Sequence, residues 1–147
     1  LTISNDNRYL DQLWPVLEDN LQRKHYAMPV HSLEEMKVLL TKFPKNIQLK
    51  VGLVDDRVEA GVVLFTSQKV CHAQYIAASE SGYMCAALDA IFNNAIMSAR
   101  ESNKQFFDFG TSNENAGMYL NDGLYKYKTE FGGGGVVHEY FEFCLTG

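Results

Sequence analysis

The chain has 147 residues, of which 46% are hydrophobic and 21% are charged, the size and composition of one globular domain rather than of a disordered chain. Thirteen basic residues against eighteen acidic residues leave a formal net charge of −5, so the basic stripe that a nucleic-acid surface requires is missing. No apolar run approaches the roughly 20 residues that a membrane helix needs, and we therefore expect neither a nucleic acid nor a membrane as a partner.

The first residue, the cysteines and the one basic cluster give expectations about domain context, cellular location and partners. Because the chain begins with Leu1 rather than Met, we expect a fragment or the C-terminal domain of a longer protein. Three widely spaced cysteines, Cys71, Cys85 and Cys144, disfavour a disulfide framework and predict a reducing, cytoplasmic location. The one basic cluster, Arg23-Lys24-His25, falls late in a predicted helix, where we interpret it as favouring the helix C-terminus rather than binding a partner.

Two amphipathic helices are predicted ahead of the first strand. The first covers about residues 6–23, and Pro15 inside it predicts a kink or a late start. Its apolar residues recur at helical spacing: Leu10, Leu13, Trp14, Leu17 and Leu21. Ser32 and Glu35 have the spacing of a capping box, which predicts a second, short helix that ends near Pro44.

Alternating segments then predict a three-stranded antiparallel meander. In Ile47–Leu53 the apolar residues point one way, and Gln48 and Lys50 point the other. Short polar turns separate this strand from Val58–Phe65, and that strand from Val70–Ala77.

The remaining elements alternate between helix and strand. We predict a long helix at Tyr83–Ser102, a buried strand at Gln105–Phe109, a helix at Glu114–Asn121, a helical turn at Leu124–Phe131 and a closing strand at Val136–Cys144. The long helix makes the connection between the third and fourth strands long enough for parallel pairing. The predicted fold class is therefore α/β (an α+β mixed sheet), with an antiparallel meander, a β-α-β crossover and flanking helices in a single domain, residues 1–147.

Five short motifs accompany this order of elements. They are His31-Ser32-Leu33-Glu34-Glu35, Phe43-Pro44-x-x-Ile47, Phe107-Asp108-Phe109-Gly110, Asn121-x-Gly123-Leu124 and Tyr127-Lys128-x-x-Phe131-Gly132. In element order and in these motifs, from about Val30 to Phe143, the chain resembles the GNAT acyltransferase superfamily, and its C-terminal third resembles the FemAB-like branch. The first two motifs resemble the entry to this domain in bacterial acetyltransferase-like proteins.

The resemblance implies a donor and a place to bind it. The donor would be acetyl-CoA or another acyl-CoA. Backbone N–H groups would hold its acyl carbonyl where the third strand splays from the next. Its pyrophosphate would lie at the N-terminus of the following helix. The alternative is that the small side chains of residues 77–79 pack tightly under the helix. The loop carries one glycine and an acid, Glu80, which repels phosphate. The implied donor-site residues are Ile76, Ala77, Ala78, Ser79, Ser81, Gly82 and Tyr83.

Three residues are candidates for catalysis. Lys128, in the last motif, can stabilise developing negative charge, or it is a solvated lysine. Asp108, within an apolar strand, can act as a base or bind a substrate amine, or it is a structural, ion-paired aspartate. Tyr125 follows the turn from which the resembled enzymes present a tyrosine to the leaving thiolate, or it serves in packing.

Substrate contacts are expected from His31, Tyr75 and Asn121, although a capping or surface role is open for His31. Cys71 and His72 are neighbours on a strand, so their side chains face opposite sides and cannot form a dyad. The histidines show no ligand spacing, and we predict no metal.

Two functions stay open. The first is an enzyme that transfers an acyl group to an amine or hydroxyl of a small metabolite or of a cell-envelope or polysaccharide precursor. The second is a non-catalytic ligand-binding or dimerisation domain of a tandem acyltransferase-like protein. Two features favour it: the donor loop has a single glycine, Gly82, and the chain starts at Leu1.

Overall fold

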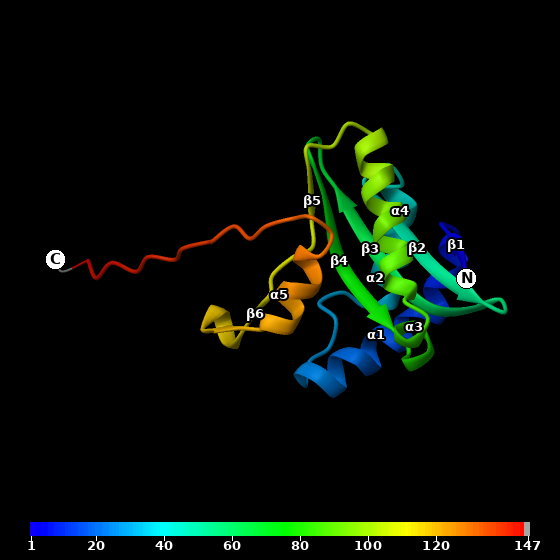
Figure 1. Cartoon of the computed structure of the whole chain (residues 1–147), viewed down its shortest axis with the longest axis horizontal. Coiled ribbons are helices and arrows are strands. Elements are labelled where there is room, and N and C mark those ends of the chain that lie inside the picture. The colour runs from blue at the N-terminus through cyan, green and yellow to red at the C-terminus, as the bar shows by residue number, and fades with distance from the viewer. Residues whose placement is uncertain (146–147) are drawn as a thin grey trace. The chain divides into compact units, whose positions relative to one another are not determined.

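A five-stranded sheet organises the first part of the chain (Figure 1). Its strands lie in the order β1-β2-β3-β4-β5, all antiparallel except for the parallel pair of β4 and β5. The predicted meander and the parallel crossover are confirmed, whereas the three-residue strand β1 was missed because so short a segment carries no readable period. The bounds are β1 Thr2–Ser4, β2 Ile47–Val54, β3 Arg57–Thr66, β4 Val70–Ala78 and β5 Phe106–Asp108.

The computed structural model describes residues 1–145, apart from the side chain of His25. The chain forms two units, Leu1–Gly110 and Thr111–Gly147. The five-stranded sheet and the helices α1 to α4 belong to the first unit, and a two-stranded hairpin and α5 belong to the second.

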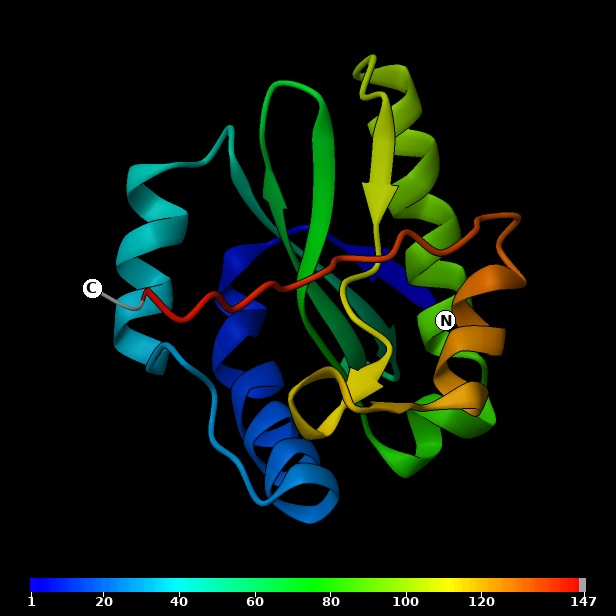
Figure 2. The same ribbon diagram turned by 90° about the vertical axis from the view of Figure 1, so that its left-hand side faces the viewer.

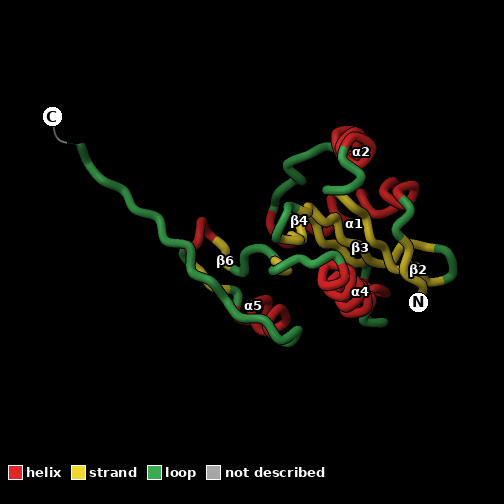
Figure 3. Tube along the Cα trace, turned by 90° about the horizontal axis from the view of Figure 1, so that it is seen from above, coloured by secondary structure: helices red, strands yellow, loops and turns green. Residues whose placement is uncertain are grey.

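Helices cover both faces of the five-stranded sheet (Figures 2 and 3). α1 (Leu10–His25) and α2 (Leu33–Lys42) lie on one face, and α4 (Ala87–Glu101) lies on the other. A 3₁₀ turn, η1 (Asn7–Tyr9), leads into α1, and the short helix α3 (Glu80–Met84) follows β4 directly. The long connection from β4 to β5 thus passes over the face opposite α1 and α2.

The main core lies between the sheet and the first two helices. Leu10, Leu13, Trp14 and Leu17 of α1 are each at most 2% exposed, which confirms the predicted stripe. They pack against apolar residues of β2, β3 and β4. α1 begins at Leu10, after the turn η1, and continues past Pro15, so Pro15 does not set its start.

Local backbone chemistry sets the ends of the helices. The predicted capping box is present at α2: the Ser32 hydroxyl accepts from the Glu35 N–H, and the Glu35 carboxylate accepts from the Ser32 N–H. The long helix predicted at Tyr83–Ser102 is confirmed as α4 from Ala87 to Glu101, but its predicted first turn is separate, because Ala86 has φ +53. A right-handed helix cannot contain this left-handed conformation, so α3 ends before Ala86 and α4 begins after it.

The second unit corrects another predicted helix. The segment Glu114–Asn121 is not helical but forms a small hairpin with a 3₁₀ turn, because Asn115, Ala116 and Gly117 have φ of 50, 53 and 90. Three successive left-handed residues exclude an α-helix. The predicted helical turn at Leu124–Phe131 is confirmed as α5. The bounds are β6 Asn113–Glu114, η2 Asn115–Gly117, β7 Tyr119–Leu120 and α5 Asp122–Thr129.

The closing strand predicted at Val136–Cys144 is also wrong, since residues 133–145 form neither helix nor strand. Their large apolar side chains are at least 75% exposed, from Val136 to Phe143. An extended segment becomes a strand only through backbone pairing with a neighbour, and the described residues provide none for this segment. Alternation in the sequence predicts which side chains face together, but it does not supply the partner.

Among the described side chains of the first unit, Lys50 of β2 is the one charged group that is buried, 4% exposed. It points away from the main core, as the alternation predicted, but α4 covers that face. Its Nζ donates to Oδ1 of Asn94 at 2.7 Å and lies 3.3 Å from Oδ1 of Asn5 and 3.4 Å from Oγ of Ser98. Burial lowers the pKa of Lys50, because the neutral amine loses less hydration than the ammonium.

This burial predicts a pH-dependent stability. Above the lowered pKa of Lys50 and below its ordinary value, the unfolded chain binds more protons, so Lys50 makes the folded state more stable as pH rises. Burial raises the pKa of Cys71, which acts with the opposite sign in the same range. The difference between wild type and Lys50→Met reports mainly Lys50, because burial, and not the charge coupling between Lys50 and Cys71, is the largest cause of both shifts. We expect the free energy of unfolding of wild type to rise relative to Lys50→Met as pH rises toward the ordinary lysine pKa, about 10.4, measured by urea unfolding. Parallel curves would contradict this account.

Candidate functional site

The parallel pairing between β4 and β5 is short. The paired residues are Val70↔Phe106, Cys71↔Phe107 and His72↔Asp108. β5 ends at Asp108, while β4 continues to Ala78 with only β3 beside it. Residues 73–78 of β4 therefore have one backbone edge that no strand of the sheet covers.

A β-bulge lies in this same part of β4. Val63 of β3 is opposite Tyr75 and Leu64 is opposite Ala73, so Gln74 has no counterpart. A bulge re-aims the side chains on either side of it and is common beside active sites. Here it lies two residues beyond the last pair of β4 with β5.

One amide on the open edge of β4 already has a partner. The Ala78 N–H donates to Oδ1 of Asn20 at 3.3 Å, and Asn20 is a buried residue of α1. The next amide along, Ser79 N–H, donates instead to Glu59 of β3. Because successive residues of a strand direct their amides to opposite edges, Ile76 presents its N–H on the same edge as Ala78.

The start of α3 is built from Ser79 and Gly82. The Ser79 hydroxyl caps the helix by accepting from the Gly82 N–H at 3.0 Å, and it donates to the Glu59 carboxylate. Gly82 is buried against β3: a Cβ at this position would lie 2.1 Å from the Glu59 carbonyl oxygen. Close packing of α3 on β3 therefore requires this glycine.

This contact predicts a large cost for Gly82→Ala. The added methyl meets backbone rather than a flexible side chain, and overpacking of this kind costs about 1–3 kcal/mol. Gly133→Ala is the matched control, since the space around Gly133 is open and the change should stay within about 0.5 kcal/mol. Urea unfolding of both variants tests this, and equal stabilities would show that α3 moves freely from β3.

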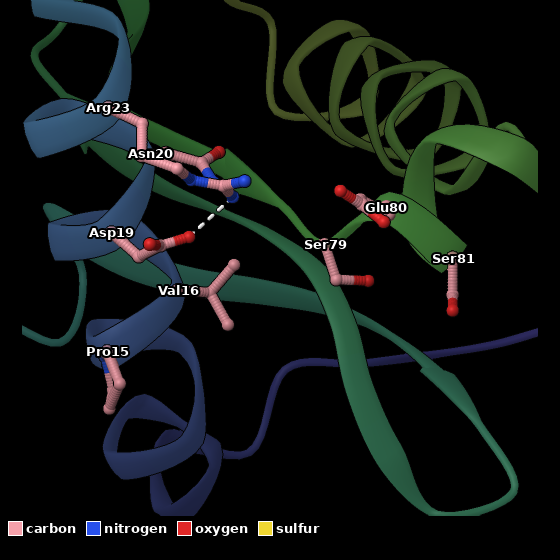
Figure 4. Close-up of a pocket in the computed structure, with 8 residues that line it drawn as sticks. All are labelled: Pro15, Val16, Asp19, Asn20, Arg23, Ser79, Glu80 and Ser81. Atoms are coloured by element: carbon pink, nitrogen blue, oxygen red, sulfur yellow. Dashed lines mark ion pairs between the residues drawn. The ribbon is translucent and has the colours of Figure 1, made fainter.

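A pocket of about 500 Å³ opens between α1 and the start of α3 (Figure 4). Arg23 lies in its wall and pairs with Asp19 at 2.5 Å. Beside it, Nζ of Lys24 donates to the Tyr83 hydroxyl at 2.7 Å and lies 4.7 Å from the ring centre. The lining residues are Pro15, Val16, Asp19, Asn20, Arg23, Ser79, Glu80 and Ser81.

The sequence assigned the basic cluster to the end of the helix, and α1 does end at His25. The structure adds that Arg23 and Lys24 lie beside the expected donor loop. The side chain of His25 lies outside the described part of the chain. Of the seven expected donor-site residues, Ser79 and Ser81 line the pocket, and Tyr83 contacts Lys24.

Two of the expected substrate residues contact each other. Nδ1 of His31 lies 2.7 Å from the Tyr75 hydroxyl, which also accepts from the His31 backbone N–H at 3.2 Å. The Tyr75 ring is buried and meets Trp14 edge-on, with ring centres 5.4 Å apart. The bulge, α1 and the segment before α2 thus converge on the Tyr75 side chain, with α1 at its ring and His31 at its hydroxyl.

Oδ2 of Asp108 lies 2.7 Å from Nδ1 of His72, a hydrogen bond that is also an ion pair when the imidazole is protonated. Its other oxygen accepts from the Gly110 N–H at 2.8 Å. Asp108 thus has the paired contacts that the structural alternative requires, and its partner is a histidine that the sequence did not assign. Gly110, at φ +75, has the left-handed conformation that glycine adopts most readily.

The remaining candidates lie in the second unit. Asn121 caps α5, with Oδ1 accepting from the Leu124 N–H and Nδ2 donating to Glu114. Tyr125 is 39% exposed on α5. Nζ of Lys128 donates to the Thr111 carbonyl at 2.5 Å.

No group of three or more His, Cys, Asp or Glu residues among the described residues is arranged to hold a metal ion. No helix in the same part of the chain is both long and apolar enough to cross a membrane.

Comparison with known families decides the class of this fold. The model of the acetyltransferase (GNAT) domain matches residues 1–129, most of the chain. The chain belongs to the GNAT acetyltransferase family. The expected acyltransferase class is thereby confirmed, and GNAT enzymes use acyl-CoA donors. The comparison with curated proteins gave no match.

Solved GNAT structures share the fold at low identity. A possible acetyltransferase from Clostridium difficile 630 is 10% identical, with a TM-score of 0.74, over 99% of this chain and 98% of that one. An aminoglycoside acetyltransferase from an uncultured soil metagenomic sample, in complex with sisomicin, is 15% identical over 97% and 96%, with a TM-score of 0.69. A ribosomal-protein-alanine N-acetyltransferase from Brucella melitensis is 12% identical over 99% of both chains, with a TM-score of 0.65. At these identities the likeness shows the fold alone.

Sequence reasoning did not assign three residues to this candidate site: Asn20, Arg23 and His72. Asn20 stood out only as a polar residue, and its burial depends on the packing of α1 against β4. For His72 a signal did exist, because its side chain was correctly placed opposite to that of Cys71. The register of β4 with β5, which brings Asp108 beside His72, could not be predicted from the sequence.

Proposed function

We propose that this GNAT domain transfers an acyl group from acetyl-CoA or another acyl-CoA to an amine or hydroxyl of a small molecule. The observation that carries the proposal is the early end of the β4–β5 pairing, which leaves the Ile76 N–H on an uncovered strand edge. A backbone N–H aimed at a thioester carbonyl stabilises the negative charge that develops on its oxygen. We also propose that the two units act together as one domain.

The residues near this edge fit the phosphate end of the donor. The first amides of α3, at Glu80 and Ser81, belong to the turn that has no acceptor within the helix. The carboxylates of Glu80 and Asp19 repel a pyrophosphate, but Arg23 and Lys24 bring two positive charges from α1 to the same place, and Arg23 would exchange Asp19 for the phosphate. Ile76–Ala78 would hold the acyl arm, and Ser79–Tyr83 would lie against the phosphates.

The acceptor is proposed to bind on the sheet face that carries His31 and Tyr75. The aminoglycoside acetyltransferase that shares this fold supports an amine-bearing small molecule, and cell-envelope or polysaccharide precursors carry such groups as well. The motifs around Asp108 and Lys128 further support the FemAB-like branch of bacterial acyltransferases. A cytoplasmic setting is proposed from the thiols of Cys71, Cys85 and Cys144, which are free.

Calorimetry with coenzyme A tests the donor. We expect wild type to bind coenzyme A, and Arg23→Gln to weaken this binding roughly tenfold, because a charged hydrogen bond to phosphate is lost. Pantetheine, which has no pyrophosphate, should bind both proteins equally. Lys45→Gln, an exposed change in the loop before β2, is the control.

Two results would contradict this prediction in different ways. Equal binding of coenzyme A by wild type and Arg23→Gln would remove Arg23 from the phosphate site. Absence of binding to wild type would reject the acyl-CoA donor and leave the alternative, a non-catalytic domain that dimerises or forms half of a tandem protein.

Lys128 is proposed to stabilise charge in the transition state, with Tyr125 as a proton donor to the leaving thiolate. Lys128→Met should then lower kcat roughly tenfold or more, about 1.4 kcal/mol of barrier, with folding intact. The assay follows coenzyme A release from acetyl-CoA with sisomicin, spermidine or glucosamine as the acceptor, and with water in their absence. Lys126→Met, an exposed lysine of the same helix, is the control. Lost stability with unchanged turnover would instead assign Lys128 to its contact with the Thr111 carbonyl.

A further inference from the structure

A hydrogen-bonded histidine and aspartate stand where β4 and β5 part. His72 and Asp108 are the last residues paired across these strands. The carboxylate is held at both oxygens, by Nδ1 of His72 at 2.7 Å and by the Gly110 N–H at 2.8 Å. The pair therefore has a fixed geometry at the edge of the opening proposed for the acyl group.

We propose that His72 takes the proton from the acceptor's amine or hydroxyl during acyl transfer, and that Asp108 is a positioning residue that holds the imidazole. This inference rests on the proposed function. A carboxylate facing Nδ1 favours the tautomer with its proton on that nitrogen, which leaves the lone pair of Nε2 to accept a proton. None of the described residues hydrogen-bonds to Nε2 of His72.

The two faces of β5 show from which side an acceptor approaches. Phe107 and Phe109 pack with Phe92 of α4, with ring centres 6.2 and 4.9 Å from it. These rings fill the α4 face at this edge of the sheet. Asp108 lies between them in the strand, so its side chain points to the opposite face, together with that of His72.

That opposite face is the one that carries the proposed acceptor residues. His72 lies across from Phe65 of β3 in the sheet register. The Phe65 ring is 6.3 Å from that of His31, which is hydrogen-bonded to Tyr75. The two polar pairs, His31–Tyr75 and His72–Asp108, therefore share one sheet face, next to each other along β4.

Exposure favours a chemical role over a structural one. The His72 side chain is 33% exposed and that of Asp108 is 51% exposed, so both can reach solvent and a bound acceptor. Ion pairs this exposed contribute little to folding stability. A substitution here consequently changes chemistry without unfolding the protein.

Acyl transfer exchanges one bond at the acyl carbon for another and moves one proton. The lone pair of the acceptor nitrogen or oxygen forms the new bond to the acyl carbon, and the carbon–sulfur bond of the thioester breaks. The sulfur leaves with the electrons of that bond. The proton lost by the acceptor moves to Nε2 of His72 and then passes to solvent or to the thiolate, which restores the neutral imidazole.

The test uses the whole chain with acetyl-CoA as the donor and the acceptors sisomicin, spermidine, glucosamine and water. We expect His72→Gln to lower kcat about a hundredfold, the low end of what a positioned base contributes, with the KM for acetyl-CoA nearly unchanged. His138→Gln, an exposed histidine of the second unit, is the control and should match wild type. Nitrogen-15 NMR of the histidines supplies a readout besides activity: His72 should carry its proton on Nδ1 in wild type and lose this preference in Asp108→Asn.

Each outcome bears on one claim. Unchanged kcat in His72→Gln, with wild type active, would overturn the role of His72 and leave the acyltransferase proposal standing. A proton on Nε2 of His72 in wild type above neutral pH would overturn it as well, whatever the activity. Absence of coenzyme A release by wild type with every acceptor would reject the proposed function itself, and the inference with it.

Discussion

The point at which β5 leaves β4 is the constraint on which the rest of the site depends. Phe107 and Phe109 anchor β5 to α4 through their contacts with Phe92. Gly110 then turns the chain at positive φ, two residues after Asp108, the last paired residue. Aromatic packing on one face and a glycine turn at the strand end thus determine how long the two strands stay paired.

Everything proposed for the site is located relative to this parting of the strands. Beyond it, β4 keeps β3 on one edge, so its amides on the other edge are available to side chains such as Asn20 or to a ligand. The strand leads straight into α3, which Gly82 holds against β3. At the parting itself stand His72 and Asp108. One short parallel ladder therefore brings an amide, a helix start and a proton acceptor to one edge of the sheet.

The two faces of the sheet are unequal, and this assigns them different tasks. One face packs against α1 and α2 and carries both polar pairs near β4. The other face is closed by α4, with aromatic rings at its β5 end and the buried Lys50 further in. α1 has a part in both binding proposals, because Trp14 meets Tyr75 while Arg23 reaches the start of α3.

The sequence by itself determined the elements whose residues repeat with a clear period. The stripe of α1, the capping box of α2 and the alternation of β2 to β4 each follow from side chains within a few positions of one another. Prediction from the sequence failed where one residue's backbone conformation decided the outcome, as at Ala86, and where a strand needed a partner, as after Gly135.

The sequence named His31, Tyr75 and Asp108 as candidates, but it did not predict their contacts. His31 meets Tyr75 across 44 positions, and His72 meets Asp108 across 36. Only the tertiary structure decided these pairs, because strand register and helix packing are set by the whole core and not by neighbouring residues.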